Sequence, residues 1–247
     1  MDVETDNLDS LRHLHQCFKK GVVKYGLLED GDKILVALSG GKDSLTMLEL
    51  LARRARIFKP RISLVALHVV MKNIDYVSDV GYLRVCCERL GVPFYCEKTS
   101  FDDRAESGKP HCFLCSWYRR KVLFEKAQEL HCNKIALGHH MDDILCTLLM
   151  NMTFSGRCTT MLPRLDMSKF SVTIIRPLCL VHESDISRYA REMNFPQQLR
   201  TCPYEDKTNR KSMTDVLHTL EKINPEARYS LWHSLNDVQV MCDKDLL

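Results

Sequence analysis

Short apolar runs alternate along this chain with longer segments in which apolar residues recur at helical spacing. Strands are expected at residues 33–38, 62–70, 92–96 and 134–137, and helices at 44–56, 79–90, 116–131 and 142–154. Parallel strands joined through helices need right-handed crossovers, which place helices on both faces of the sheet. The pattern therefore predicts an α/β fold with a doubly wound, mostly parallel sheet. Outside it, helices are expected at 8–25, 184–193 and 210–223, and a hairpin at 161–176.

The composition favours a protein with reduced thiols. The 247 residues fit one large domain, or one domain with a small appendage. The 12 cysteines amount to about 5%, below the roughly 8–10% that marks a short secreted disulfide scaffold. The acidic N-terminus has no apolar signal segment, and the longest uncharged run, residues 144–156, is 13 residues long where a membrane span needs about 20. We therefore expect a cytoplasmic protein with no membrane partner.

The loop after the first expected strand reads Ser39-Gly40-Gly41-Lys42-Asp43-Ser44. Its glycines allow a tight turn and close approach of a ligand, and the helix that follows offers unpaired amides at the positive end of its dipole. Lys42 adds a cation, the serine hydroxyls can donate, and Asp43 can reach Mg²⁺ or cap the helix. The spacing is not that of a Walker loop. The loop is predicted to bind phosphate; the alternative is a glycine turn before a capped helix.

Cys112 and Cys115 are separated by two residues at the expected opening of the 116–131 helix. Such a pair can ligate zinc, hold an iron–sulfur cluster or act as a redox couple. A structural zinc ion needs four ligands, and the sequence contains no second Cys-x-x-Cys. Cys202 lies in a later loop, long enough to return it to the pair. Three thiolates would leave one position open at the metal centre, as catalysis requires.

A third motif, Gly138-His139-His140-Met141-Asp142-Asp143, follows the fourth expected strand and enters a helix. Open α/β sheets bind their ligands beyond the carboxyl ends of the strands. Carboxylates at a helix start suit the helix dipole and can hold Mg²⁺. The alternative is helix capping beside a solvated histidine pair. Because the other two motifs are also present, we favour the interpretation that this motif lies at a ligand-binding edge of the sheet.

The first motif resembles the signature of the PP-loop ATP pyrophosphatases, which adenylate a substrate oxygen with ATP and release pyrophosphate. The order of the three motifs, followed by Arg176-Pro177-Leu178 and a late cysteine, resembles that of tRNA thiolases of the 2-thiocytidine type over roughly residues 10–225. This resemblance implies the Rossmann-like adenine nucleotide alpha hydrolase fold. It also implies a tRNA sulfurtransferase that adenylates the C2 oxygen of a pyrimidine, taken as cytidine 32, and replaces it by sulfur to give 2-thiocytidine.

The same resemblance implies a set of cofactors and site residues. A [4Fe-4S] cluster would be held by Cys112, Cys115 and Cys202. ATP with Mg²⁺ would bind at Ser39, Gly40, Gly41, Lys42, Asp43, Ser44 and Gly138. Lys42, Arg119 and Asp143 are expected to neutralise phosphate charge or assist adenylation. The implied partners are tRNA, a sulfur donor such as a cysteine desulfurase, and a second copy in a homodimer.

We expect three parts of the chain: an N-terminal helical segment at 1–28, the PP-loop ATPase domain with the Cys-x-x-Cys insertion at 29–195, and a C-terminal loop with helices, carrying the third cluster cysteine, at 196–247. The net charge of +3 is mild, so tRNA binding would need local basic groups. Two are candidates, each otherwise a solvated helix face. They are Arg53, Arg54, Arg56, Lys59 and Arg61, and then Lys207, Arg210 and Lys211.

Several alternatives stay open at this point. Phe113, Trp117 and Tyr118 could stack a flipped base or belong to the core. Family members usually have glutamate where this chain has Cys146, which is either a buried substitute or an extra thiol near the cluster. The alternative functions are a 2-thiouridine-forming thiolase, a cluster-free enzyme that uses a cysteine persulfide, and a nucleotide- or redox-sensing protein that modifies nothing.

Overall fold

The computed structural model describes residues 2–74, 78–101, 111–167, 169–196 and 209–235. These residues group into two compact units, which are described separately. The first unit lies within Met1–Met141 and Leu162–Glu205, and the second within Asp142–Met161 and Asp206–Leu247. No helix in the described ranges is long and apolar enough to cross a membrane.

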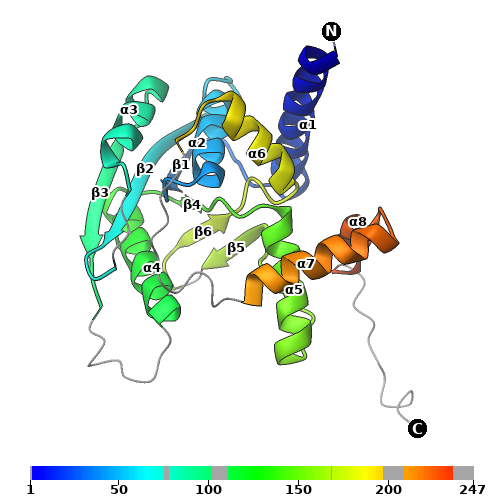
Figure 1. Cartoon of the computed structure of the whole chain (residues 1–247). Coiled ribbons are helices and arrows are strands. Elements are labelled where there is room, and N and C mark those ends of the chain that lie inside the picture. Colours follow the sequence, from blue (N-terminus) through cyan, green and yellow to red (C-terminus); the bar gives the residue numbers. More distant parts are fainter. Residues whose placement is uncertain (1, 75–77, 102–110, 168, 197–208, 236–247) are drawn as a thin grey trace. The chain divides into compact units, whose positions relative to one another are not determined.

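The first unit is built on a mixed sheet, drawn in Figure 1. Its strands are β1 (Asp32–Ala37), β2 (Ile62–Met71), β3 (Phe94–Thr99), β4 (Lys134–Ala136), β5 (Arg164–Met167) and β6 (Val172–Ile175). Their order is β3-β2-β1-β4-β6-β5, and every neighbouring pair is parallel except β5 with β6. The mostly parallel sheet and the hairpin are both confirmed. β3 is longer than expected, because the polar residues Glu97, Lys98 and Thr99 continue its pairing with β2 at an edge where one face is exposed.

Helices cover both faces of this sheet, as predicted for a doubly wound fold. The first unit contains α1 (Asp2–Lys24), α2 (Lys42–Ala55), α3 (Val80–Leu90), α4 (His111–Glu129) and α6 (Glu183–Glu192). One core joins α1, α2, α3 and α6 to the sheet, through residues such as Leu14, Leu48 and Ile186. A second core joins α4 to the other face through Leu123, Phe124 and Ala127. The sheet is therefore buried between two helical layers.

Two helices begin five or more residues earlier than the sequence predicts, and the other expected helix boundaries agree to within two residues. α4 begins at His111 rather than at 116, so both cysteines of the pair lie inside the helix. The sequence did carry a signal for this start, since proline is common at the first turn of a helix and Pro110 precedes His111. α1 begins at Asp2 rather than at residue 8.

The second unit is helical. It contains α5 (Met141–Ser155) from its second residue onward, α7 (Asn209–Ile223) and α8 (Ala227–Ser234). α8 was not expected, because eight residues are too few for an amphipathic period to stand out. Its Trp232 is buried and its Arg228 is held by carboxylates of α5 and α7.

A buried ion pair ties the start of β1 to β4. The ammonium of Lys134 lies 2.8 Å from Asp32 Oδ2, and both side chains are only 2% exposed. Lys134 also donates to the carbonyl of Leu27 (3.1 Å), and Asp32 accepts from the amide of Asn133 (2.7 Å) and from the backbone N–H of Glu29 (2.6 Å). Each of these buried charges thus has several partners within the protein.

Replacing Lys134 by methionine is expected to lower the free energy of unfolding by about 3–5 kcal/mol, because Asp32 is left as an uncompensated buried charge. Urea denaturation measures the loss. The double variant Asp32→Asn/Lys134→Met should recover part of it, since no unpaired charge remains. A loss below about 1 kcal/mol, typical of exposed pairs, would contradict this account of the pair.

Candidate functional site

The strand order of the first unit reverses between β1 and β4. From β1 the chain proceeds outward to β2 and β3, whereas β4 is followed outward by β6. Such a reversal leaves a crevice beyond the carboxyl ends of the two strands, where open α/β sheets bind ligands. The loop of residues 39–44 leaves β1 at this crevice, and Gly138 and His139 leave β4 there. Two of the three sequence motifs therefore meet at one place.

The loop after β1 is fixed by its own hydrogen bonds. The Ser44 hydroxyl accepts from the Gly40 N–H (3.2 Å) and from Ser39 Oγ (3.1 Å), and donates to the carbonyl of Gly41 (2.9 Å). Gly40 has a φ of 92°, a left-handed conformation that favours glycine. Gly41 precedes α2 and has no side chain to cap it. The loop is thus shaped in advance and leaves the first amides of α2 for an anion.

Lys42 is held beside this loop by two carboxylates. Its ammonium lies 2.9 Å from Asp43 Oδ1 and 2.9 Å from Glu183 Oε1 of α6. Burial acts to lower the pKa of Lys42, but the charges and hydrogen bonds of Asp43 and Glu183 raise it overall. Lys42 is therefore a fixed cation at the phosphate loop. Asp43 lies at the same place and offers oxygen atoms of the kind that Mg²⁺ prefers.

Gly138 lets β4 end directly against the loop. A Cβ atom added at Gly138 would lie 3.3 Å from both the backbone nitrogen and the Cα of Ser44. Those atoms are backbone, so a side chain here would displace the loop instead of a flexible neighbour. This contact explains why a glycine occupies the position and places Gly138 with the loop residues.

Gly138→Ala is expected to weaken ATP binding about tenfold, a cost of roughly 1.4 kcal/mol, because it shifts the amides of α2 that would face the phosphates. Isothermal titration calorimetry with ATP measures the change. Gly81→Ala is the matched control, since the nearest atom there is a side-chain oxygen of Asp79, which can move. Equal ATP affinities for the Gly138→Ala protein and the wild type would refute the role of this contact.

The segment after β4 also meets a buried arginine. Arg176 follows β6, is 7% exposed, and donates from Nε to His139 Nδ1 (3.3 Å) and from its guanidinium to the carbonyl of Leu162. Burial lowers the pKa of Arg176, although a guanidinium remains charged at any ordinary pH. The stretch 176–178 of the sequence resemblance therefore contributes a cation to the same edge of the sheet.

His68, near the end of β2, is a polar residue that sequence reasoning missed. It is 2% exposed, and its Nδ1 lies 2.7 Å from the carbonyl of Leu38, directly before the loop. Burial lowers the pKa of His68, with a further contribution from the charge of Arg119, so the ring is neutral and Nδ1 must donate. Its Nε2 is then an acceptor, and among the described residues it has no hydrogen-bond partner. The only sequence signal was a histidine inside an apolar strand.

The cysteine pair lies in the first turns of α4. Cys112 is exposed and Cys115 is half-buried, and residues three apart on a helix share a face. None of the cysteines in the described residues is in a disulfide bond. Cys115 packs beside the cluster of Met71, Phe101 and Leu114, which fixes this end of α4 against the end of β2. Arg119 follows one turn after Cys115 on the same helix.

The donor set at this position fits part of an iron–sulfur site. Two thiols on one helical face, neither of them in a disulfide bond, can serve as two of its ligands. Cys202, the third predicted ligand, lies outside the described residues. Within the described ranges no group of three or more His, Cys, Asp or Glu side chains could hold a metal ion, so a further ligand has to come from elsewhere in the chain or from outside it.

The acidic end of the third motif belongs to the second unit. Asp143 pairs with Arg210 of α7 (3.3 Å), and Asp142 pairs with Arg228 of α8, which also binds Glu221. Arg210 was one of the basic residues considered for tRNA; in this unit it neutralises Asp143. Lys207 lies outside the described residues. Both carboxylates of the motif are therefore paired with arginines in their own unit.

Cys146 is a buried thiol of α5. It is 2% exposed, its Sγ lies 3.6 Å from Thr214 Oγ1, and burial raises the pKa of the thiol. A raised pKa keeps it protonated and unreactive at neutral pH. The geometry favours the buried-substitute interpretation of this departure from the family pattern.

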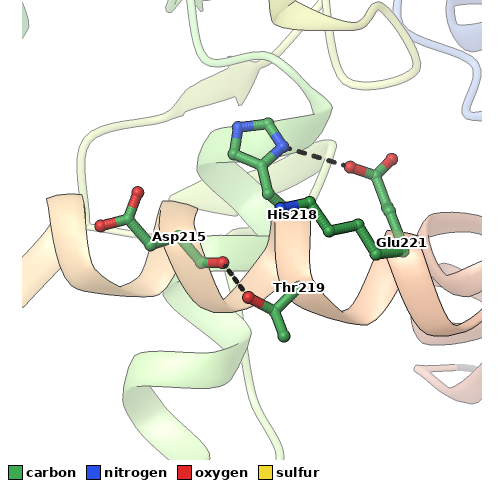
Figure 2. A pocket seen from close by; sticks show the side chains of 5 residues that line it. Asp215, His218, Thr219 and Glu221 are labelled. Carbon is green, nitrogen blue, oxygen red and sulfur yellow. Dashed lines mark hydrogen bonds and ion pairs between the residues drawn. The ribbon is translucent and has the colours of Figure 1, made fainter.

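A surface hollow of about 630 Å³ lies along α7 (Figure 2). Its lining consists of Asp215, His218, Thr219, Glu221 and Lys222. His218 Nδ1 lies 3.3 Å from Glu221 Oε2, and the Thr219 hydroxyl donates to the carbonyl of Asp215 (2.9 Å), as the dashed lines in Figure 2 mark. All five residues come from one helix, and no residue of the three motifs is among them. The hollow is a helix surface and contributes nothing to the candidate site.

The first basic group is partly neutralised by the fold. Arg53 lies 3.5 Å from the buried Glu49, Arg61 lies 3.7 Å from Asp30, and Arg54 donates to the carbonyl of Lys59 (2.9 Å). These contacts close the end of α2 and the turn that follows it. The group is accordingly a weaker candidate for nucleic-acid binding than its sequence composition indicates.

Comparison with known proteins gives consistent matches over most of the chain. The family model described as PP-loop domain matches residues 7–232. A tRNA-cytidine(32) 2-sulfurtransferase of Geobacter sulfurreducens is 37% identical over 242 residues, which cover 94% of this chain and 93% of the relative. The protein of the same name from Cupriavidus metallidurans is 35% identical over 234 residues, covering 92% of this chain and 74% of the relative.

A solved structure has the same fold. It is the U34-tRNA thiolase NcsA from Methanococcus maripaludis with its [4Fe-4S] cluster, which is 25% identical and superposes with a TM-score of 0.73. The match covers 96% of this chain and 82% of that chain. The likeness confirms the Rossmann-like, doubly wound architecture expected from the sequence.

Proposed function

The chain belongs to the PP-loop family and, within it, to the family of the tRNA-cytidine(32) 2-sulfurtransferases, and we propose on this premise that it is an ATP-dependent tRNA sulfurtransferase. Its substrate is cytidine 32 of tRNA, and its product is 2-thiocytidine. The observation that carries the proposal is the presence, at one edge of one sheet, of a preformed phosphate loop and a helical pair of cysteines that are not in a disulfide bond.

The chemistry that this edge supports begins with the nucleotide. The phosphates of ATP would lie on the amides of residues 40–44 with Lys42 beside them, and Asp43 would bind the accompanying Mg²⁺. The C2 oxygen of the cytidine attacks the α-phosphate, and pyrophosphate leaves. That oxygen is then a good leaving group, because it departs as part of AMP when sulfur attacks C2. Fixed cations such as Lys42 stabilise the charge that develops on the phosphate, and Arg119 is the proposed second one.

The sulfur-handling end of the site would be α4. A [4Fe-4S] cluster on Cys112, Cys115 and Cys202 would supply, when bound, an iron with an open coordination position for a sulfur ligand. Neither of the two described thiols is in a disulfide bond, and both lie on one face of the first turns of α4, as two ligands of one cluster require. Asp143 remains a proposed catalytic residue of the second unit.

The remaining parts of the proposal concern the cellular location, the sulfur donor and the oligomeric state. Free thiols at every described cysteine suit the cytoplasm, where disulfides do not persist. The sulfur would come from a donor such as a cysteine desulfurase, and the enzyme would act as a homodimer.

Release of pyrophosphate tests this function. With ATP and Mg²⁺, the purified protein should release pyrophosphate only when tRNA is added, because adenylation needs the cytidine oxygen. A coupled pyrophosphate assay, run with and without tRNA and with a tRNA whose position 32 is not a pyrimidine, measures it. Release of inorganic phosphate in place of pyrophosphate, or no tRNA dependence, would argue against an adenylating enzyme and favour a nucleotide-sensing protein.

A further inference from the structure

Two large aromatic side chains stand exposed on α4 beside the cysteine pair. Phe113 is 50% exposed and Trp117 is 47% exposed. They are four residues apart, so they are neighbours on one face of the helix. Cys112, directly before Phe113, is exposed as well. Aromatic side chains normally bury most of their surface. An exposed aromatic pair beside the cysteine pair therefore indicates a surface that a ligand covers.

The Trp117 ring is held in place by neighbouring aromatic side chains. Trp117 meets Tyr118 edge to face, with ring centroids 4.9 Å apart, and Tyr118 lies 6.0 Å from the ring of Phe101. Phe101 is 6% exposed and belongs to the cluster with Met71 and Leu114. Trp117 is therefore braced against a side chain that reaches into the core, which reduces the entropy lost when a flat ligand stacks on it.

The charge around these rings suits a polyanion. From His111 to Phe124, α4 carries Arg119, Arg120 and Lys121 and no carboxylate. The ammonium of Lys121 lies 5.9 Å from the centre of the Trp117 ring. Its 3.8 Å ion pair with Glu125 is exposed on both sides and therefore weak, so a phosphate can compete for this cation. Aromatic faces flanked by cations form the usual platform for unpaired nucleotides, whose bases stack while their phosphates meet the cations.

We propose that Phe113 and Trp117 form a stacking platform for an unpaired base of the tRNA loop, with Lys121 placed for its phosphate. This inference rests on the proposed function and adds the mode of substrate recognition. A pyrimidine whose C2 oxygen reacts must be unstacked from its neighbours, and the platform gives its ring, or that of the adjacent nucleotide, a replacement partner next to the thiols. Tyr118, in contrast, serves as the support beneath Trp117.

The chain allows a direct optical test, because it contains only two tryptophans, Trp117 and Trp232. The variant Trp232→Phe leaves Trp117 as the single reporter. Titration with an anticodon stem-loop RNA should quench its fluorescence, since a stacked base quenches indole emission. In the full-length protein, Trp117→Ala and Phe113→Ala should each weaken binding of this RNA about tenfold, while Trp117→Phe retains most of the affinity.

Controls separate stacking from folding and from charge. Phe154→Ala removes another exposed aromatic side chain, 60% exposed and outside both basic groups, and should leave RNA affinity unchanged. Trp117→Ala should keep wild-type ATP affinity and the wild-type salt slope of RNA binding, whereas Lys121→Ala should reduce that slope by about 1.

Two results would overturn the platform while leaving the proposed function intact. One is tight RNA binding with no change in Trp117 fluorescence and no effect of Trp117→Ala on affinity. The other is a Trp117→Ala protein with normal RNA affinity but altered sedimentation, which would assign the rings to an interface between protein chains. Failure of the proposed function has a different signature, namely RNA binding without tRNA-dependent pyrophosphate release.

Discussion

Serine in place of Cys112 or Cys115 is expected to strip the protein of iron and to abolish thiolation. Serine is nearly isosteric, but its hydroxyl is not ionised at neutral pH and is a poor ligand for iron in a cluster. Loss of a residue that merely orients a metal ligand costs about 10- to 100-fold, so loss of a ligand should cost more than about 100-fold in activity. The effect should be the same for either cysteine, because each is proposed to supply one ligand to the same cluster from the same face of α4.

Iron and sulfide analysis after anaerobic purification and reconstitution measures the loss. Cys158→Ser is the matched control, since Cys158 is also an exposed free thiol but lies outside the pair, and it should keep its iron and activity. Cys202→Ser should behave like the pair. A Cys202→Ser protein with a full cluster would remove Cys202 from the ligand set, and thiolation by an iron-free wild-type protein would favour a persulfide mechanism.

Lys42→Met is expected to slow tRNA-dependent pyrophosphate release by about 100- to 1,000-fold, the usual cost of removing one preorganised group that stabilises a developing charge. Methionine keeps most of the length of the side chain and removes its charge. The ammonium is fixed by Asp43 and Glu183 at 2.9 Å each, so the fold has placed this cation before any nucleotide binds.

Single-turnover assays with saturating ATP and tRNA measure this rate, and calorimetry measures ATP affinity separately. Lys42→Arg is a second useful variant, because it keeps the charge but changes the geometry of the head group. Its rate of pyrophosphate release should lie between those of the methionine variant and the wild type. The role of Lys42 would be contradicted by a methionine variant whose rate lies within a few-fold of the wild type, with unchanged ATP affinity.

The order of strands and helices along the chain could be predicted from the sequence, because the short apolar runs of the strands differ clearly from the helical spacing of apolar residues in the helices. Residues 34–38 are uniformly apolar, as expected for a parallel strand covered on both faces, and β1 is buried along most of its length. The start of α4 could not be predicted from the sequence, because residues 111–118 mix cysteine and aromatic residues without a helical period. Its two faces meet different environments, one packed on Met71 and Phe101 and the other exposed.

The phosphate loop could be located from the sequence because its chemistry is local. The resemblance also pointed to Gly138 and Arg176, but the contacts of the residues around the loop could not be predicted, since they depend on the order of strands in the sheet. Gly138 contacts Ser44 only because β4 lies next to β1, and Glu183 reaches Lys42 only because α6 packs on the same face as α2. Arg176 meets His139 for the same reason, since β6 neighbours β4. Side-chain exposure, in turn, distinguished Trp117 from Tyr118, which no spacing could do.

The most direct test of the account is nucleoside mass spectrometry of tRNA treated with the reconstituted protein, ATP, Mg²⁺ and a sulfide donor. The proposed function predicts that 2-thiocytidine appears at position 32 and that it requires both ATP and an intact Cys112–Cys115 pair. A thiolated uridine as the product would reassign the substrate. Formation of no thionucleoside by a protein that holds its cluster and binds ATP would contradict the sulfurtransferase itself.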